Sequence, residues 1–241
     1  MSLFSVNPDA RLSRISLHDG RDCLVVDDFL LEPEHVRAYA AARSDDFSML
    51  AYNRFPGPEI QLGADQVKQV VRWWKRDARS ALKLSRIVHQ FHARMSIVTH
   101  SPEQLSLVQR FCHRDGAASE VRGNVLYAGV LYLFDDADLG GTAFYRNINP
   151  DWRAVIALAG KVGEDALKER YPFFGQAPCY MTESNEFFER TFVVPPAFNR
   201  IIFYPGDIFH SGHITHPEKL SRDPLKGRLT INFFVDAVKP V

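Results

Sequence analysis

The stretch Phe111-Cys112-His113-Arg114-Asp115-Gly116 places a histidine and an aspartate two positions apart, between two runs rich in apolar residues. On an extended strand, residues two apart project from the same face. His113 and Asp115 would therefore present one imidazole and one carboxylate side by side. These are two of the three ligands of the 2-His-1-carboxylate arrangement that binds non-haem Fe(II). Such a pair also arises by chance. The arrangement requires a second histidine, which has to come from elsewhere in the chain.

The surrounding sequence is organised as a series of apolar, β-like runs. We expect strands at residues 23–26, 91–98, 105–111, 125–134, 140–145, 200–204 and 228–235. Helical spacing of apolar residues predicts helices at 36–43, 65–84 and 152–170. In the second of these, Trp73 and Trp74 are expected in the core. The predicted class is a β-rich α+β protein.

The expected organisation is a single domain over residues 1–241. Residues 1–90 would supply an N-terminal strand and supporting helices, and residues 91–241 a β core interrupted by an insertion at about 146–190. This insertion, rich in aromatic residues, could be a lid over a site or a helix covering one sheet. The loop Arg54-Phe55-Pro56-Gly57-Pro58 could be a surface turn or the rim of a pocket.

The last clear strand, 228–235, alternates between two kinds of side chain. Arg228, Thr230 and Asn232 would share one face, and Leu229, Ile231 and Phe233 the other. A polar face on this strand indicates either a polar-lined cavity or a sheet open to solvent.

A third metal ligand is available at His210, which follows a strand and a Pro-Gly turn. Two histidines and one carboxylate fill one face of an octahedron and leave three positions open. A 2-oxo acid can chelate two of these positions, and dioxygen can take the third. The far carboxylate of such a co-substrate needs a fixed cation, for which the permanently charged, bidentate guanidinium of Arg228 is suited.

Several motifs occur in an order that resembles the Fe(II)/2-oxoglutarate-dependent dioxygenase superfamily, and most closely its prolyl-hydroxylase-like branch. The motifs are His113-Arg114-Asp115, Tyr132-Leu133-Phe134, Gly140-Gly141-Thr142-Ala143-Phe144, Phe203-Tyr204-Pro205-Gly206, His210-Ser211-Gly212 and Arg228-Leu229-Thr230-Ile231. The opening Val25-Val26-Asp27-Asp28-Phe29-Leu30 is also similar to the strand that starts many of these enzymes.

This resemblance implies a double-stranded β-helix (jelly-roll, cupin-like) core with flanking N-terminal helices and an inserted helical segment. It implies His113, Asp115 and His210 as iron ligands with a catalytic role, and Arg228 as the partner of the 2-oxoglutarate C5 carboxylate. Tyr132 falls where the family often places a tyrosine that hydrogen-bonds the same co-substrate. Thr230 and Asn232 are further candidates for lining the co-substrate site.

The sequence departs from the family pattern in its spacing. His210 and Arg228 are 18 residues apart (228 − 210), more than is usual in the family, which leaves Arg222 and Lys226 as alternative anchors. His213 competes with His210 as third ligand, and the family pattern favours His210. His216 is expected in a loop.

Composition excludes some classes of partner and location. The 29 basic residues balance the 29 acidic ones, which gives no reason to expect a nucleic acid or an anionic membrane as partner. Three widely spaced cysteines predict a reducing compartment rather than a disulfide framework. No signal peptide or membrane span is expected, so we predict a cytoplasmic protein.

The predicted activity is an Fe(II)- and 2-oxoglutarate-dependent oxygenase that hydroxylates a C–H bond and releases succinate and CO2. The substrate would be an amino acid, a peptide or another small molecule, with dioxygen as the second co-substrate. One alternative is a jelly-roll protein that binds or senses a ligand without turnover. Another is a zinc hydrolase with the same three ligands, which would have no use for a buried arginine behind the metal.

Overall fold

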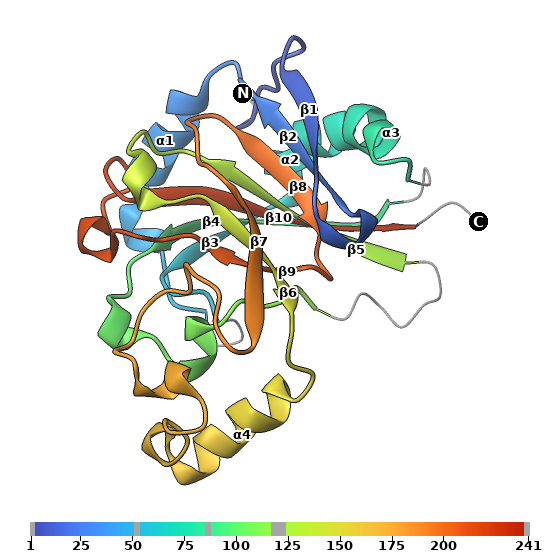
Figure 1. The fold of residues 1–241 in the computed structure, drawn as a ribbon. Coiled ribbons are helices and arrows are strands. Elements are labelled where there is room, and N and C mark those ends of the chain that lie inside the picture. Colours follow the sequence, from blue (N-terminus) through green and yellow to red (C-terminus); the bar gives the residue numbers. More distant parts are fainter. Residues whose placement is uncertain (1–2, 51–53, 85–87, 117–123, 239–241) are drawn as a thin grey trace.

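Two antiparallel β-sheets form the centre of the computed structural model, which describes residues 3–50, 54–84, 88–116 and 124–238 (Figure 1). The large sheet has seven strands in the order β1-β2-β8-β5-β10-β4-β3, and the small sheet has three in the order β7-β6-β9. The strands of the large sheet are β1 (Arg11–Ser16), β2 (Asp22–Asp27), β3 (Glu59–Leu62), β4 (Val88–Val98), β5 (Asn124–Tyr132), β8 (Ile201–Pro205) and β10 (Arg228–Val238). The small sheet contains β6 (Thr142–Asn147), β7 (Phe188–Val194) and β9 (Phe209–Gly212).

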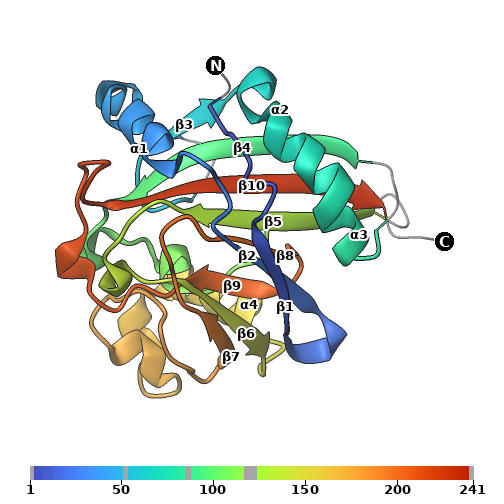
Figure 2. The ribbon, with the colours of Figure 1, turned by 90° about the horizontal axis from the view of Figure 1, so that it is seen from above.

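The helices are few and short. They are α1 (Pro33–Ala41), α2 (Ala64–Trp73), a π-helical turn (Trp74–Ala78), α3 (Arg79–Ala81) and α4 (Trp152–Val162). Single 3-10 turns occur at His18–Gly20, Ser44–Asp46, Pro102–Gln104, Leu107–Arg110, Ala137–Leu139, Glu164–Ala166, Pro172–Gly175 and Pro217–Lys219. Helices α2 and α3 cover the outer face of the large sheet, whereas α4 lies at the far end of the small sheet (Figures 1 and 2).

The central strand β10 has the two faces that its alternation predicts. Leu229, Ile231 and Phe233 are fully buried and pack in the same core cluster as Trp73 and Trp74, as expected for those tryptophans. The opposite face points toward the small sheet. A second cluster joins that inner face to the small sheet by packing Tyr132 and Tyr204 with Phe144 and Val194. The two sheets therefore lie face to face (Figure 2).

Local chemistry explains where the observed elements differ from the expected ones. Residues 105–111 were expected to form a strand but form a 3-10 turn, because Ser106 and Gln109 close a capping box with a Ser106 N to Gln109 Oε1 distance of 2.8 Å. The expected helix 152–170 ends at Val162, where Gly163 takes φ +85°. Strands β1, β3, β7 and β9 were not predicted; β7 begins within the predicted insertion, and β9 contains His210, which was expected to follow a strand and a turn.

Substitution of Gly141 is expected to destabilise the protein. A Cβ at this position would lie 2.0 Å from the carbonyl oxygen of Val194, so one backbone segment would have to move. We expect Gly141→Ala to lower the free energy of unfolding by about 1–3 kcal/mol, measured by urea denaturation. The matched control is Gly160→Ala in α4, where a Cβ meets nothing within 4 Å, and where alanine should be neutral or stabilise by up to about 1 kcal/mol. Equal stability of both variants would contradict the close approach at Gly141.

Candidate metal centre

Three side chains with metal-binding donors meet at the edge of the small sheet. His113 and His210 form an isolated antiparallel bridge in which each backbone N–H donates to the other's carbonyl at 2.9 Å. The N–H of Asp115 donates to the carbonyl of Gly206 at 2.9 Å, so the backbone is held at Asp115 as well as at His113. One donor atom from each of the three residues lies within 4.8 Å of the other two. The structure thus brings together the three residues predicted as ligands.

The carboxylate of Asp115 lies between the two imidazoles. Its oxygens are 3.5 Å from Nε2 of His113 and 3.3 Å from Nε2 of His210. Burial acts to raise the pKa of Asp115, but the charges and hydrogen bonds of the two histidines outweigh it and hold this pKa well below its usual range. The carboxylate is therefore ionised, as a metal ligand has to be.

The imidazole of His210 has a fixed orientation. Its Nδ1 lies 3.0 Å from the carbonyl oxygen of Ile208, so Nδ1 carries the proton and donates it there. Nε2 points toward Asp115 and the centre, so it is the ring nitrogen that would bind a metal, while the other nitrogen is held by a carbonyl as is typical of metal-bound histidines. The ring also packs edge-on against Tyr204, with a centroid distance of 4.7 Å. His113 is different, since its side chain is 59% exposed and faces the cavity.

The cavity beside these residues has a volume of about 550 Å³, within the range of about 300–1,000 Å³ of small-molecule sites. Its walls include four of the predicted site residues, which are His113, Asp115, Arg228 and Asn232. The loop residues Arg54, Phe55 and Pro56 also line it, so the interpretation of that loop as a pocket rim is correct.

Arg228 is buried at the end of β10, with 4% of its surface exposed. Its Nε donates to the carbonyls of Leu139 and Gly140 at 3.0 and 3.1 Å, and its Nη2 donates to that of Gly141 at 3.0 Å. These carbonyls hold the guanidinium in place, and Arg228 is also among the residues that line the cavity. Burial lowers the pKa of Arg228, but a guanidinium stays charged in proteins.

The other predicted co-substrate residues lie at different depths. Asn232 lines the cavity, whereas Tyr132 and Thr230 are almost completely buried and are not part of the described wall. The hydroxyl of Tyr132 lies 2.7 Å from Oγ1 of Thr142. Burial raises the pKa of this tyrosine, and its hydrogen bond to Thr142 and the charge of Arg228 oppose that rise. The role of Tyr132 and Thr230 in binding a co-substrate stays a prediction.

The alternative residues lie away from the centre. Nε2 of His213 is 3.2 Å from Nη1 of Arg190, and burial together with that cation lowers the pKa of His213. Arg222 and Lys226 are exposed in the loop before β10, and His216 lies in the same connection. None of these four residues lines the cavity as the structure describes it.

Sequence reasoning missed several cavity residues, among them Glu59 and Arg94, whereas Tyr180 lies in the aromatic-rich insertion that was considered as a lid. Arg94 belongs to the polar face of β4, so the alternation of residues 91–98 carried a signal for it. Glu59 lies in an unpredicted strand of four residues. The aromatic residues Phe173, Phe174, Phe187 and Phe188 of the predicted insertion pack with Phe111 in a core of their own, and the insertion reaches the cavity through Tyr180 and Met181.

The fold resembles several solved structures at low sequence identity. The non-haem α-ketoglutarate-dependent epimerase SnoN from nogalamycin biosynthesis is 11% identical, with a TM-score of 0.44 over 90% of this chain and 81% of that one. The collagen prolyl hydroxylase vCPH of Paramecium Bursaria Chlorella virus-1 is 12% identical, with a TM-score of 0.43 over 90% and 96%. HygX from Streptomyces hygroscopicus, solved with iron bound, is 13% identical, with a TM-score of 0.44 over 88% and 81%.

In the part of the chain that the structure describes, no helix has the length and apolar character needed to cross a membrane.

Comparison of sequences gives a family without an assigned function. No curated protein matches the chain. Residues 8–235 match the family of unknown function DUF6445. The chain therefore belongs to the DUF6445 family.

Proposed function

We propose that this protein is an Fe(II)- and 2-oxoglutarate-dependent oxygenase that hydroxylates a C–H bond of a small substrate, with release of succinate and CO2. The observation that carries the proposal is the meeting of His113, Asp115 and His210 beside a cavity that His113, Asp115 and Arg228 line. Two of the three donors of the facial type lie on the cavity wall, His210 is buried behind them, and a buried guanidinium lines the same cavity. The sequence motifs that resemble the prolyl-hydroxylase-like branch lie at these same residues.

The strand order supports a double-stranded β-helix as the core of this proposal. Strands β4, β10, β5 and β8 are consecutive in the large sheet. In the small sheet β7, β6 and β9 are consecutive, and the bridge at His113 adds a fourth segment beside β9. Two facing groups of four antiparallel segments form a jelly roll. We propose that the chain is one domain, with β1–β3 and the N-terminal helices added to this core.

The donor set fits a ferrous ion. Two neutral imidazole nitrogens and one carboxylate suit non-haem Fe(II), and the exposed side of His113 leaves the centre open to the cavity. When bound together with 2-oxoglutarate and dioxygen, ferrous iron supplies the oxidation that places one oxygen atom in succinate and the other in the substrate. The chain's own contribution is to hold the three donors, through the His113–His210 bridge and the Ile208 carbonyl.

Arg228 would bind the far carboxylate of 2-oxoglutarate. A guanidinium pairs strongly with a carboxylate where water is excluded, and its other edge is already held by the carbonyls of residues 139–141. A zinc hydrolase with the same three ligands would not require the buried guanidinium of Arg228. A binding protein without turnover would keep the same residues, so activity has to be measured.

The experiment is a screen for succinate formation by the purified protein with Fe(II), ascorbate and 2-oxoglutarate in air. We expect slow succinate release without substrate and a clear increase with the correct substrate. The matched control replaces Fe(II) with Zn(II), which cannot carry the redox chemistry and should abolish the signal. Substrate conversion that proceeds equally well with Zn(II) and without 2-oxoglutarate would contradict the proposal.

A further inference from the structure

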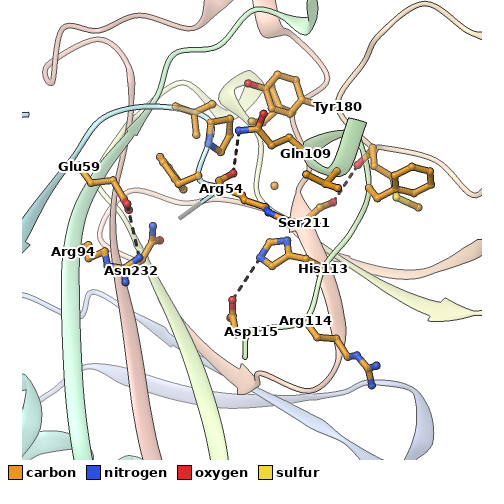
Figure 3. Close-up of a pocket in the computed structure, with 18 of the residues that line it drawn as sticks. Arg54, Glu59, Arg94, Gln109, His113, Arg114, Asp115, Tyr180, Ser211 and Asn232 are labelled. Atoms are coloured by element: carbon orange, nitrogen blue, oxygen red, sulfur yellow. Dashed lines mark hydrogen bonds and ion pairs between the residues drawn. The ribbon is translucent and has the colours of Figure 1, made fainter. Parts of the chain in front are cut away.

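The cavity wall formed by β3, β4 and β10 carries an ion pair, one member of which is buried, that the proposed chemistry does not use. Glu59 of β3 and Arg94 of β4 both line the cavity, and their closest N–O distance is 3.8 Å. Glu59 is 2% exposed and Arg94 has 23% of its side chain exposed. Figure 3 shows both residues with Asn232 on the wall that faces His113 and Asp115 across the cavity.

A directed chain of hydrogen bonds fixes this wall. The hydroxyl of Ser96 donates to Glu59 Oε1 at 2.6 Å, and the amide nitrogen of Asn232 donates to Ser96 Oγ at 3.0 Å. The hydroxyl of Thr230 donates to Oδ1 of Asn232 at 3.3 Å. Because a carboxylate only accepts, Glu59 sets the direction of the whole chain and the orientation of the Asn232 amide. The wall is thus built before any ligand arrives.

The cavity also has apolar lining. Phe55, Val98, Ile214 and Phe234 line the same cavity, and the guanidinium carbon of Arg94 lies 5.3 Å from the centroid of the Phe234 ring. Hydrogen bonds between oppositely charged groups are the strong ones, and more so where water is excluded. A ligand with one positive and one negative group, a short distance apart, would bring a complementary charge to each member of the pair.

We propose that Glu59 and Arg94 bind the ammonium and the carboxylate of a free α-amino acid, which presents its side chain to the metal centre. This inference rests on the proposed function and names the substrate class of the same site. Arg94 would pair with the α-carboxylate, Glu59 with the α-ammonium group, and Asn232 would hydrogen-bond beside them. A cavity of about 550 Å³ suits such a small substrate beside a co-substrate. An internal residue of a protein, which lacks both charges, would not fit this wall.

The test has two arms. The first measures binding of Fe(II) and 2-oxoglutarate under anaerobic conditions from the visible charge-transfer absorption, which reports on the centre alone. The second measures succinate formation and substrate oxidation, by mass spectrometry, for the common L-amino acids, their N-acetyl derivatives and their carboxamides. We expect at least one free amino acid to stimulate succinate formation, and its two derivatives to do so far less.

Two variants assign the charges. Glu59→Gln keeps an acceptor for Ser96 but loses the charge, so KM for the amino acid should rise roughly 10–150-fold, the equivalent of one charged hydrogen bond. It should also lose the preference for the free over the N-acetylated amine. Arg94→Gln should lose the preference for the carboxylate over the carboxamide. The controls Glu34→Gln and Arg72→Gln, at exposed positions of α1 and α2, should match the wild type.

The outcomes separate the two proposals. A loaded centre that no free amino acid stimulates, or that accepts the capped derivatives equally well, would overturn the amino-acid assignment and leave the oxygenase intact. An unchanged KM in both variants, with lower stability by thermal melting, would make the pair a structural ion pair and would also overturn it. A centre that binds neither Fe(II) nor 2-oxoglutarate would remove the oxygenase proposal itself.

Discussion

Replacement of Asp115 by alanine is expected to lower the affinity for Fe(II) by more than about 100-fold and to abolish succinate formation. Even partners that only orient a metal ligand are worth about 10–100-fold in metal affinity, and Asp115 would be a ligand itself. Its carboxylate is also the only acidic group among the three residues that meet at the centre. The measurement is anaerobic titration with Fe(II), followed by a succinate assay on the same preparation.

His213→Ala is the matched control for this prediction. His213 lies three positions from His210 and contacts Arg190 instead of the centre. This variant should bind Fe(II) as the wild type does. Loss of binding in His213→Ala together with normal binding in Asp115→Ala would place the metal elsewhere.

Replacement of Arg228 by glutamine is expected to raise the 2-oxoglutarate requirement roughly 30-fold or more while leaving Fe(II) binding nearly unchanged. Truncating one partner of a buried, hydrogen-bonded charge pair costs about 2–5 kcal/mol, and about 1.4 kcal/mol corresponds to a factor of ten. Glutamine is chosen because its amide can still donate toward the carbonyls of Leu139, Gly140 and Gly141, which alanine would leave without a partner. The measurement is the dependence of succinate formation on 2-oxoglutarate concentration.

Two further variants sharpen this test. Arg228→Lys keeps the charge but loses the bidentate geometry, so its requirement should lie between those of the wild type and the glutamine variant. Lys226→Ala removes the alternative anchor, whose side chain is 79% exposed, and should have no effect. A changed requirement in Lys226→Ala with none in Arg228→Gln would move the anchor to the loop.

The sequence predicted the central part of the fold because that part is strongly patterned. The alternation along β10 determines which side chains enter the core and which line the cavity, and the same rule applies to any strand buried on one face. Ile231 and Asn232 illustrate the two sides, since the first is fully buried against the helices and the second lines the cavity. Strand β3, with only four residues and Gln61 exposed, has too short a pattern to be recognised.

The candidate site was only partly predictable, because residues distant in sequence come together through pairing that no local pattern specifies. His113 and His210 form an isolated bridge instead of a strand pair. The side chains of His113 and Asp115 do lie close together, as predicted, but not on a regular strand. Glu59 and Arg94 meet because β3 pairs with β4, with Gln61 opposite Arg94 and Glu59 opposite Ser96. The pairing register of β3 with β4 therefore places Glu59 and Arg94 on the same wall of the cavity.

The central claim is that two histidines, one aspartate and one arginine form a single site for a ferrous ion and 2-oxoglutarate. Anaerobic addition of 2-oxoglutarate to the Fe(II)-loaded protein tests it directly, because chelation of the iron by the 2-oxo acid produces a visible charge-transfer band. The account predicts a band that saturates at one equivalent of iron per chain, is absent in Asp115→Ala and needs far more 2-oxoglutarate in Arg228→Gln. A protein that binds Fe(II) but shows no band at any 2-oxoglutarate concentration, or an unchanged band in both variants, would contradict it.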